Sequence, residues 1–437
     1  MKMKVSCLLI AWLAFWSCGA SSRSAQAQQA DTVSFVQLEF NVPARLKATA
    51  LEVHSLEVKP ILLSKELDKL SGSVSVTDSL SSPENGPMVV FVQMDDGSLW
   101  TARLESGESI GTQSRRYTFD PVKLEPNPVS SEIRAESVRQ VFMNVPSGEY
   151  SGITHVKDDV YAVVHDKGSG GGIHLFKIPI TSASVVQDIS SKEVPGNADG
   201  PSGRDNEDIV YVPSSGTLFV SSEGDQSIRE YTIEGAPTGR SLTIPADLAD
   251  IQPNAGFEAL AFDAANGFFW AATEKSLSTE GLHRNILRLQ RFNAETLEPD
   301  ARYLYIMENP VIADSQSSSA SAYVHGLSAM TVLEDGRLVM LEREVYVPGG
   351  SVIEKALGAF TLSTLYVVDP LHDKGGILEK KLLTRVVTSA LNLANYEGIC
   401  LGPKLSGGRQ SLLLIADSQN GQGGLTGEYL QLLAIRP

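Results

Sequence analysis

The chain has 437 residues, of which 42% are hydrophobic and 20% are charged, and its formal net charge is −16. This composition is typical of a folded protein with a hydrophobic core, and it excludes a largely disordered chain. The excess of acids argues against nucleic acid as a partner, because phosphates require a basic surface, and it suits a protein that binds cations.

The first residues have the pattern of an export signal. Two lysines precede an apolar run over residues 5–20, and Ala25-Gln26-Ala27 resembles a cleavage site. The run is shorter than the roughly 20 residues that a bilayer core requires, so we expect a signal peptide over residues 1–27 and no membrane span. Its removal takes away three basic residues and no acid, which changes the net charge from −16 to −19. Cys18 could instead carry a lipid anchor, so the exported protein is expected in the periplasm, outside the cell or at the outer membrane.

The three cysteines exclude an internal disulfide framework. Cys7 and Cys18 belong to the signal or its edge, which leaves Cys400 alone in the apolar run "GICLGP", where we expect a small buried side chain. The chain contains no G-x-S-x-G, H-E-x-x-H or Walker motif. The usual serine hydrolases, zinc proteases and nucleotide-binding proteins are therefore excluded.

Residues 31–130 contain β-like runs such as "VSFVQLEFNV" and "MVVFVQMDDGSLWTARLE", separated by polar stretches. They form either a separate small β domain or a further repeat of the unit described next. We favour the separate domain.

From Tyr150 onward the chain repeats one unit, in which two apolar strands are joined by a tight turn and the second strand ends in an acid. The five pairs are "SGITHVKDDVYAVVHD", "EDIVYVPSSGTLFVSSE", "EALAFDAANGFFWAATE", "SAMTVLEDGRLVMLE" and "EGICLGPKLSGGRQSLLLIAD". Repeated antiparallel units of this length are typical of propeller blades. We therefore predict an all-β chain, with a β-propeller of five to six four-stranded blades over residues 135–437 after a small β-rich N-terminal region. Residues 136–145 are the candidate for the strand that closes the ring.

The acids of these pairs are expected to meet on one rim of the propeller. The start of the first strand and the end of the second share one edge of a blade, because the two strands are antiparallel. The acids at these places are Asp166, Glu207, Glu223, Glu258, Glu274, Glu342, Glu397 and Asp417.

Crowded carboxylates repel one another unless a cation compensates them. A calcium ion, which takes six to eight oxygen ligands, would use these acids directly. An internal salt-bridge network, or a simply solvated rim, remains the alternative. Basic residues next to the acids, which could also bind an anionic substrate, are Arg204, Lys275 and Arg343. His155 and His325 are candidates for a general acid or a phosphate donor on the same rim.

The strand openings "YSGI", "NEDIVY", "FEALAFD" and "NYEGICLGP", with the strand ends "VSSEGD", "AATEKS" and "LIADSQN", resemble the phytase-like propeller family. The resemblance covers roughly residues 145–437. It implies a propeller with an acidic, calcium-dependent site that hydrolyses phosphate or other esters. In the alkaline phytases, calcium ions bridge carboxylates and substrate phosphates, while basic side chains hold the phosphate.

The sequence thus favours a secreted, calcium-dependent ester hydrolase that acts as a monomer on a small phosphate ester. The eight acids would bind the metal, and Arg204, Lys275 or Arg343 would stabilise the developing charge. Two alternatives are a noncatalytic propeller that presents its rim to a partner at the cell surface, and a calcium-dependent lactonase or carboxylesterase.

Overall fold

The computed structural model describes residues 33–56, 61–84, 86–104, 106–142, 144–165, 172–181, 186, 188–194, 205–248, 255–277, 285–373, 376–389, 392–419 and 426–436. The predicted signal peptide, Cys18, Asp166 and Arg204 lie outside these residues. Within the described part of the chain, no helix combines the length and the apolar character that a bilayer crossing requires.

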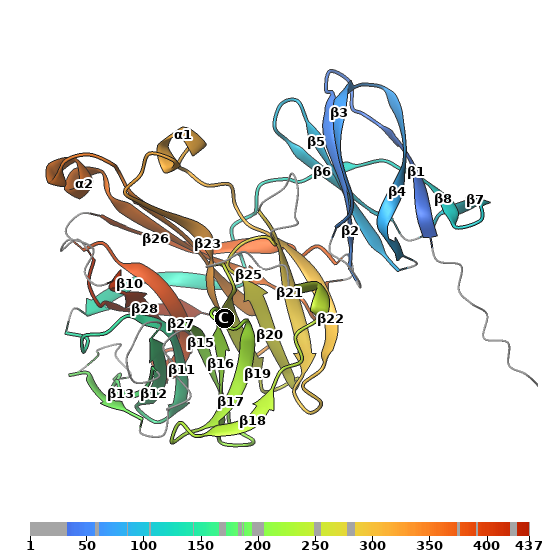
Figure 1. Cartoon of the computed structure of the whole chain (residues 1–437). Coiled ribbons are helices and arrows are strands. Elements are labelled where there is room, and N and C mark those ends of the chain that lie inside the picture. Colours follow the sequence, from blue (N-terminus) through green and yellow to red (C-terminus); the bar gives the residue numbers. More distant parts are fainter. Residues whose placement is uncertain are drawn as a thin grey trace, which may run out of the picture.

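The N-terminal part is a sandwich of two β-sheets, seen at the upper right of Figure 1. Its strands are β1 (Val33–Asn41), β2 (Ala48–Ser55), β3 (Ile61–Leu70), β4 (Ser73–Glu84), β5 (Met88–Met94), β6 (Leu99–Leu104), β7 (Glu108–Gly111), β8 (Ser114–Phe119) and β9 (Val122–Lys123). The sheet orders are β4-β1-β8-β7 and β3-β2-β5-β6-β9. One core is shared by the two sheets, with Val36 and Leu38 of β1 packed in the same cluster as Leu51 and Val53 of β2. These strands form their own core and are not a blade of the propeller.

The remaining strands form five four-stranded antiparallel sheets. Blade 1 contains β11 (Tyr150–Lys157), β12 (Val160–His165), β13 (Ile173–Lys177) and β14 (Ser190–Glu193). Blade 2 contains β15 (Asn206–Val212), β16 (Thr217–Ser222), β17 (Ser227–Thr232) and β18 (Pro237–Ser241), and blade 3 contains β19 (Phe257–Asp263), β20 (Phe268–Thr273), β21 (Ile286–Asn293) and β22 (Pro299–Ile306). Blade 4 contains β23 (Ala322–Val332), β24 (Leu338–Val347), β25 (Phe360–Val368) and β26 (Lys380–Ser389). Blade 5 contains β27 (Asn395–Leu405), β28 (Arg409–Asp417), β29 (Leu430–Arg436) and β10 (Arg134–Phe142). Among the described residues, the short helices η1 (Ala246–Leu248), α1 (Asp314–Ser317) and α2 (Val352–Gly358) lie in connecting segments.

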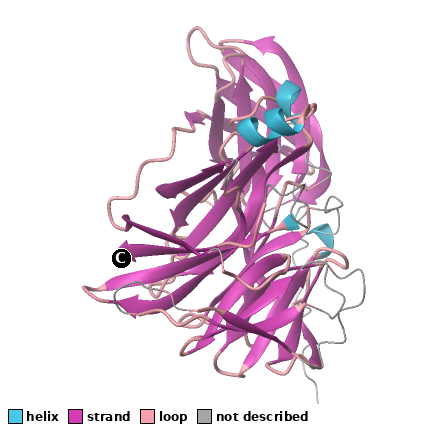
Figure 2. Ribbon diagram, turned by 90° about the vertical axis from the view of Figure 1, so that its left-hand side faces the viewer, coloured by secondary structure: helices cyan, strands magenta, loops and turns pink. Residues whose placement is uncertain are grey.

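The five blades close into a ring. The inner strands β11, β15, β19, β23 and β27 each contact the inner strands of both neighbouring blades, and β27 contacts β11. β10 comes from before blade 1 in the chain and pairs with β29 as the outermost strand of blade 5. This exchange joins the first and last blades, and closure protects strand edges that would otherwise be exposed. Figure 2 shows the blades from the side, with strands throughout and helices only in the connections. The predicted all-β propeller and its closing strand are confirmed.

The turns of the blade hairpins follow from local sequence. In the β19–β20 turn the Asp263 carboxylate accepts hydrogen bonds from the backbone N–H groups of Ala265 and Asn266, at 3.1 and 3.0 Å. Gly267 then takes a positive φ of 72°, which an L side chain would resist. Gly216 does the same in the β15–β16 turn, at 68°. These turns fix the register of each hairpin, and with it the positions of the acids at its far end.

The sandwich is joined to blade 3 by a buried interface. Phe91 of β5 packs in one apolar cluster with Ile286 of β21 and Leu304 of β22. Beside this cluster His54 Nε2 lies 2.9 Å from Glu52 Oε2, and Arg288 Nη2 lies 3.0 Å from His54 Nδ1. A guanidinium can only donate, so His54 Nδ1 accepts and Nε2–H donates to Glu52. The three side chains are buried and link the two parts of the chain.

Candidate metal centre

Each of the five inner strands carries a β-bulge at the same place near its start. In blade 3, Phe257 pairs with Thr273 and Ala259 pairs with Ala272, so Glu258 is an extra residue in the ladder. A bulge bends the strand locally and re-aims the side chain of its extra residue. The equivalent residues are Ser151, Glu207, Glu258, Ser328 and Glu397, and all five are buried. They are the residues at which the five sequence repeats begin.

A second position that is equivalent from blade to blade lies at the end of the second strand of each blade. The Glu223 N–H donates to Asp205 O at 2.8 Å, and the Glu274 N–H donates to the main-chain oxygen of Gly256 at 2.9 Å. Gly326 pairs with Arg343 in the same way, and Asn395 pairs with Asp417. Blades 2 to 5 therefore carry Glu223, Glu274, Arg343 and Asp417 at this position. Asp166, which follows β12, lies outside the described residues.

The sequence assigned this position in blade 4 to Glu342, and the structure gives it to Arg343. Side chains alternate along a strand, so a shift of one residue moves a side chain to the opposite face. Glu342 Oε1 instead accepts hydrogen bonds from Lys380 Nζ at 2.5 Å and from Tyr305 Oη at 2.6 Å. Glu342 is therefore part of a buried contact between blades 3 and 4, and the structure does not bring it to the cluster of acids.

Two glycines allow the acids of one blade to lie against the next blade. A Cβ at Gly326 would lie 2.4 Å from Glu274 Cγ, and a Cβ at Gly256 would lie 3.0 Å from Glu223 Cγ. The Gly256 N–H also donates to Glu223 Oε1 at 2.7 Å. The carboxylates of blades 2 and 3 are thus held against the inner strands of the following blades.

Arg343 compensates one half of the cluster. Its Nη2 donates to Glu274 Oε1 at 3.0 Å, and its Nη1 donates to Glu397 Oε1. Burial alone would lower the pKa of Arg343, but the carboxylates of Glu274, Glu258 and Glu207 outweigh burial and raise it above its ordinary value. Blades 3, 4 and 5 are therefore joined by a buried ion-pair network, which is what the alternative interpretation of the acids predicted.

The other half of the cluster has the geometry of a metal site. One carboxylate oxygen from each of Asp205, Glu207 and Glu223 lies within 4.8 Å of the other two. Burial raises the pKa of Glu223, and the charges of Glu274 and Asp205 raise it further. Three hard oxygen donors this close together match the preference of calcium. A bound dication would remove the repulsion among them.

Glu258 lies between the two halves of the cluster. Its side chain is buried. Burial raises its pKa well above the ordinary value, with Glu274 adding to the effect and Arg343 opposing it. Burial of this carboxylate beside other acids is costly, and a bound cation would offset that cost.

The remaining rim residues lie at the edge of the cluster. Lys275 Nζ is 3.0 Å from Glu274 Oε2, and its side chain is about one-third exposed. An Asp417 oxygen accepts a hydrogen bond from the Gln419 N–H at 2.8 Å. His325 lies opposite Glu344 on β24. Burial lowers the pKa of His325, against the nearby carboxylates of Glu342, Glu344 and Glu274, so its imidazole is neutral near pH 7. Lys275 and His325 are thus near the cluster, whereas Arg204 lies outside the described residues.

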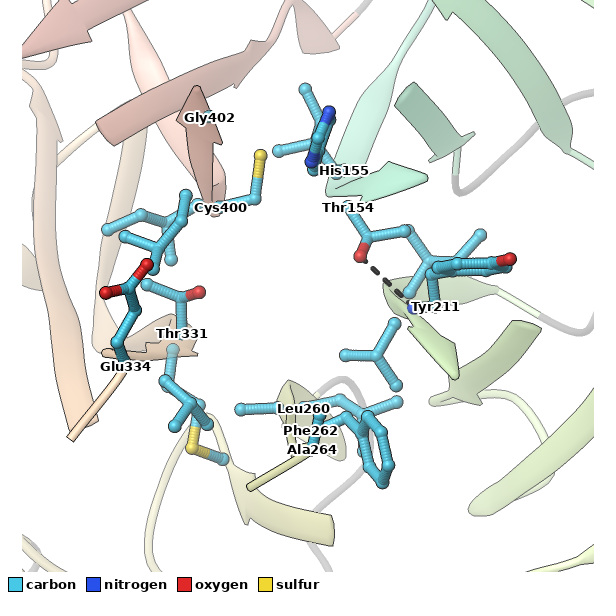
Figure 3. A pocket seen from close by; sticks show the side chains of 18 of the residues that line it. Thr154, His155, Tyr211, Leu260, Phe262, Ala264, Thr331, Glu334, Cys400 and Gly402 are labelled. Atoms are coloured by element: carbon cyan, nitrogen blue, oxygen red, sulfur yellow. Dashed lines mark hydrogen bonds between the residues drawn. The ribbon is translucent and has the colours of Figure 1, made fainter. Parts of the chain in front are cut away.

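The structure places His155 at the opposite mouth of the channel. It belongs to the wall of a cavity of about 390 Å³ that all five inner strands line (Figure 3). His155 Nε2 donates to Asp158 O at 2.8 Å, next to the β11–β12 turn. Cys400, buried as expected, lines the same cavity. His155 therefore cannot act at the rim where the acids meet.

Two residues of the cluster were not among the site residues named from the sequence. Asp205 contributes to the metal-binding group, and Asn395 donates to Glu397 Oε1 at 2.7 Å. Both precede an inner-strand glutamate by two residues, so this spacing was the signal that could have found them. The neighbouring Asp208 is structural, because its Oδ2 accepts the Leu260 N–H of blade 3 at 2.8 Å.

Comparison with known proteins agrees with this architecture. Residues 145–419, more than half of the chain, match the family described as phytase-like, esterase-like activity of phytase. No curated protein matches the chain.

Several solved structures resemble parts of the chain. A protein of unknown function from Bacteroides thetaiotaomicron is 10% identical, with 88% of this chain and 90% of that chain covered and a TM-score of 0.33. A protein from Lactobacillus plantarum is 13% identical, with 85% and 93% covered and a TM-score of 0.31. A carbohydrate-active enzyme of family AA12 from Trichoderma reesei is 10% identical, with 71% and 99% covered and a TM-score of 0.34. These scores are too low to support any conclusion.

Proposed function

Because the chain belongs to the phytase-like family, we propose that it is a calcium-dependent ester hydrolase whose substrates are small phosphate esters. The observation that carries this proposal is the group formed by Asp205, Glu207 and Glu223, whose oxygens lie within 4.8 Å of one another. The donors are all carboxylates, which suits calcium better than a nitrogen-preferring metal.

The proposed metal would be held by these three residues, and Glu258 would stand next to them. A bound calcium ion would supply Lewis acidity for a water molecule and for the ester oxygen. The buried Glu258 carboxylate would accept a proton from that water. Lys275 is a partly exposed cation beside Glu274 and would stabilise charge on a phosphate.

Arg343 has a different role in this proposal. Its Nη1 and Nη2 donate to Glu397 and Glu274, so it would link blades 3 to 5 and add positive potential beside the metal-binding group. The eight acids named from the sequence would then not all bind metal. The proposal assigns the metal to blade 2 and leaves Glu274 and Glu397 to Arg343.

The same ion pairs favour a second candidate, a noncatalytic binding propeller. If Arg343 compensates the acids sufficiently, the cluster needs no metal and stabilises the ring by itself. We also infer that the protein is exported, on the basis of the signal pattern in residues 1–27, and we propose that it acts as a monomer.

The test is a hydrolysis screen of the purified mature protein with excess calcium and with chelator. Phosphomonoesters, phytate, lactones and aryl carboxylesters are compared at neutral and alkaline pH. We expect phosphomonoester hydrolysis that chelator abolishes. Hydrolysis of lactones or aryl esters alone would show that the substrates are not phosphate esters. No hydrolysis of any of the four substrate classes, with calcium or with chelator, would favour the binding propeller.

A further inference from the structure

A layer of five aliphatic side chains crosses the channel between the acid cluster and the cavity at the opposite mouth. Each member lies two residues after the bulged residue of its inner strand, which is about 7 Å further along the strand. The five residues are Ile153, Ile209, Leu260, Met330 and Ile399. They are only 1% or 2% exposed, and all of them line the cavity of about 390 Å³. The cavity therefore has an apolar inner end that separates it from the acids.

The next two positions of each inner strand shape the rest of the cavity. The first of them carries a small side chain in every blade: Thr154, Val210, Ala261, Thr331 and Cys400. The second carries a larger, half-buried side chain in every blade: His155, Tyr211, Phe262, Val332 and Leu401. Figure 3 shows the labelled side chains arranged around an open centre. The volume and the largely apolar and aromatic lining are those of a site for a small molecule.

The acid and the lysine that line the cavity compensate each other. Lys404 Nζ lies 2.8 Å from Glu334 Oε1, and both side chains are mostly exposed, so this pair lies at the mouth. An ion that entered the cavity would lose its water and would find this pair already compensated. The charges therefore favour a neutral ligand.

A buried hydroxyl without a partner lies beside the cavity. Within the described chain, the Tyr161 Oη is buried and has no hydrogen-bond partner. A Cβ at Gly402, which lines the cavity, would lie 3.1 Å from this oxygen, and the rings of Tyr161 and His155 are 4.9 Å apart. Burial raises the pKa of Tyr161, so the hydroxyl stays protonated and can donate. A buried donor without an acceptor is costly, and an acceptor beside Gly402 would remove that cost.

We propose that this cavity binds a small neutral molecule with an aromatic or aliphatic body and one hydrogen-bond acceptor, such as a ketone oxygen. The body would occupy the space next to the aliphatic layer, and the acceptor would lie beside Gly402 and accept a hydrogen bond from Tyr161. The absence of a side chain at Gly402 leaves room for this contact. The site lies at the other end of the channel from Asp205, Glu207 and Glu223, and it does not depend on the proposed hydrolysis.

The test is binding of prodan, a neutral naphthalene ketone whose emission shifts to the blue in apolar surroundings, by the mature protein. Thr331→Phe places a ring at a half-buried position of the cavity and should abolish binding. Tyr161→Phe keeps the ring and removes only the hydroxyl, so prodan should bind about threefold to tenfold more weakly, as expected for one neutral hydrogen bond. Glu223→Gln, at the acid cluster, is the matched control and should bind prodan as wild type does.

A pair of competitors of nearly the same shape checks the hydrogen bond. Acetylnaphthalene carries a carbonyl and isopropylnaphthalene does not, so wild type should prefer the ketone, and Tyr161→Phe should lose that preference. Without ligand, Tyr161→Phe should melt at or above the temperature of wild type, because the variant lacks an unpaired buried hydroxyl. Wild type that binds no prodan, binding that persists in Thr331→Phe, or equal prodan affinities of wild type and Tyr161→Phe would overturn the proposal.

Discussion

Replacement of Glu223 by glutamine tests the metal centre most directly. Glu223→Gln keeps the shape of the side chain and removes one of three carboxylates whose oxygens lie within 4.8 Å. Burial and the charges of Glu274 and Asp205 raise the pKa of Glu223, so the charged form is disfavoured in the metal-free protein. The variant should therefore be at least as stable as wild type in chelator, and it should lose the response to calcium.

The size of that response follows from ligand linkage. A ligand present at a hundred times its dissociation constant stabilises the folded state by about 2.7 kcal/mol. In a large domain each kcal/mol raises the melting temperature by about 2 °C, so wild type should melt about 5 °C higher with calcium than with chelator. Glu223→Gln should show less than about a third of this difference, because a neutral amide oxygen is a weaker ligand for calcium.

The assay is thermal unfolding of both proteins with excess calcium and with chelator. Glu334→Gln is the matched control, because Glu334 is an exposed acid at the opposite mouth of the channel, paired with Lys404. It should respond to calcium as wild type does. Equal melting temperatures of wild type in calcium and chelator would refute the metal centre, and a Glu223→Gln protein that is destabilised in chelator would point to a salt-bridge network.

Three further changes probe other buried charges. Burial, then the Glu274 charge, raises the pKa of Glu258 well above its ordinary 4.5. The folded chain then holds a proton that the unfolded chain has lost, so stability in chelator should fall as pH rises above the ordinary pKa of a glutamate, and Glu258→Gln should flatten that slope in melting curves. Arg343→Gln should lower the free energy of unfolding by about 3–5 kcal/mol in denaturant titrations, because it leaves buried carboxylates uncompensated, and a loss under about 1 kcal/mol would contradict this. His54→Ala should cost about 3 kcal/mol or more and split the calorimetric transition in two, and a single unchanged transition would speak against the interface.

Much of the fold could be predicted because the hairpins are specified locally. Turn residues such as Gly216 and Gly267 fix the register, and each turn is flanked by two apolar strands. The predicted starts of the five repeats coincide with the bulged residues, which is why Glu207, Glu258 and Glu397 were found together. The local sequence was sufficient to predict the positions of the acids wherever the strand pairs of different blades share one register.

The parts of the site that the sequence could not settle depend on register and strand length. The run "LEREV" alternates charges around Arg343, so nothing local shows which of residues 342 and 343 faces the channel. The pairing of Gly326 with Arg343 decides it, together with a bulge at Ser328. The prediction that His155 lies on the same rim as the acids was wrong for another reason. It lies four residues after Ser151, and at about 3.3 Å per residue this carries it roughly 13 Å along the channel, away from the acids.

We expect the sandwich to stabilise the propeller, although the family match begins only at residue 145. Arg288 lies on β21 of blade 3 and is buried against His54, whose other ring nitrogen donates to Glu52. Removal of the sandwich would leave a guanidinium on blade 3 that was buried and paired, and would expose the apolar contact at Ile286. Blade 3 also carries Glu258 and the acid that binds Arg343, yet no sandwich residue belongs to the acid cluster within the described chain. The sandwich is therefore expected to affect the site through the rigidity of blade 3, and not by supplying ligands.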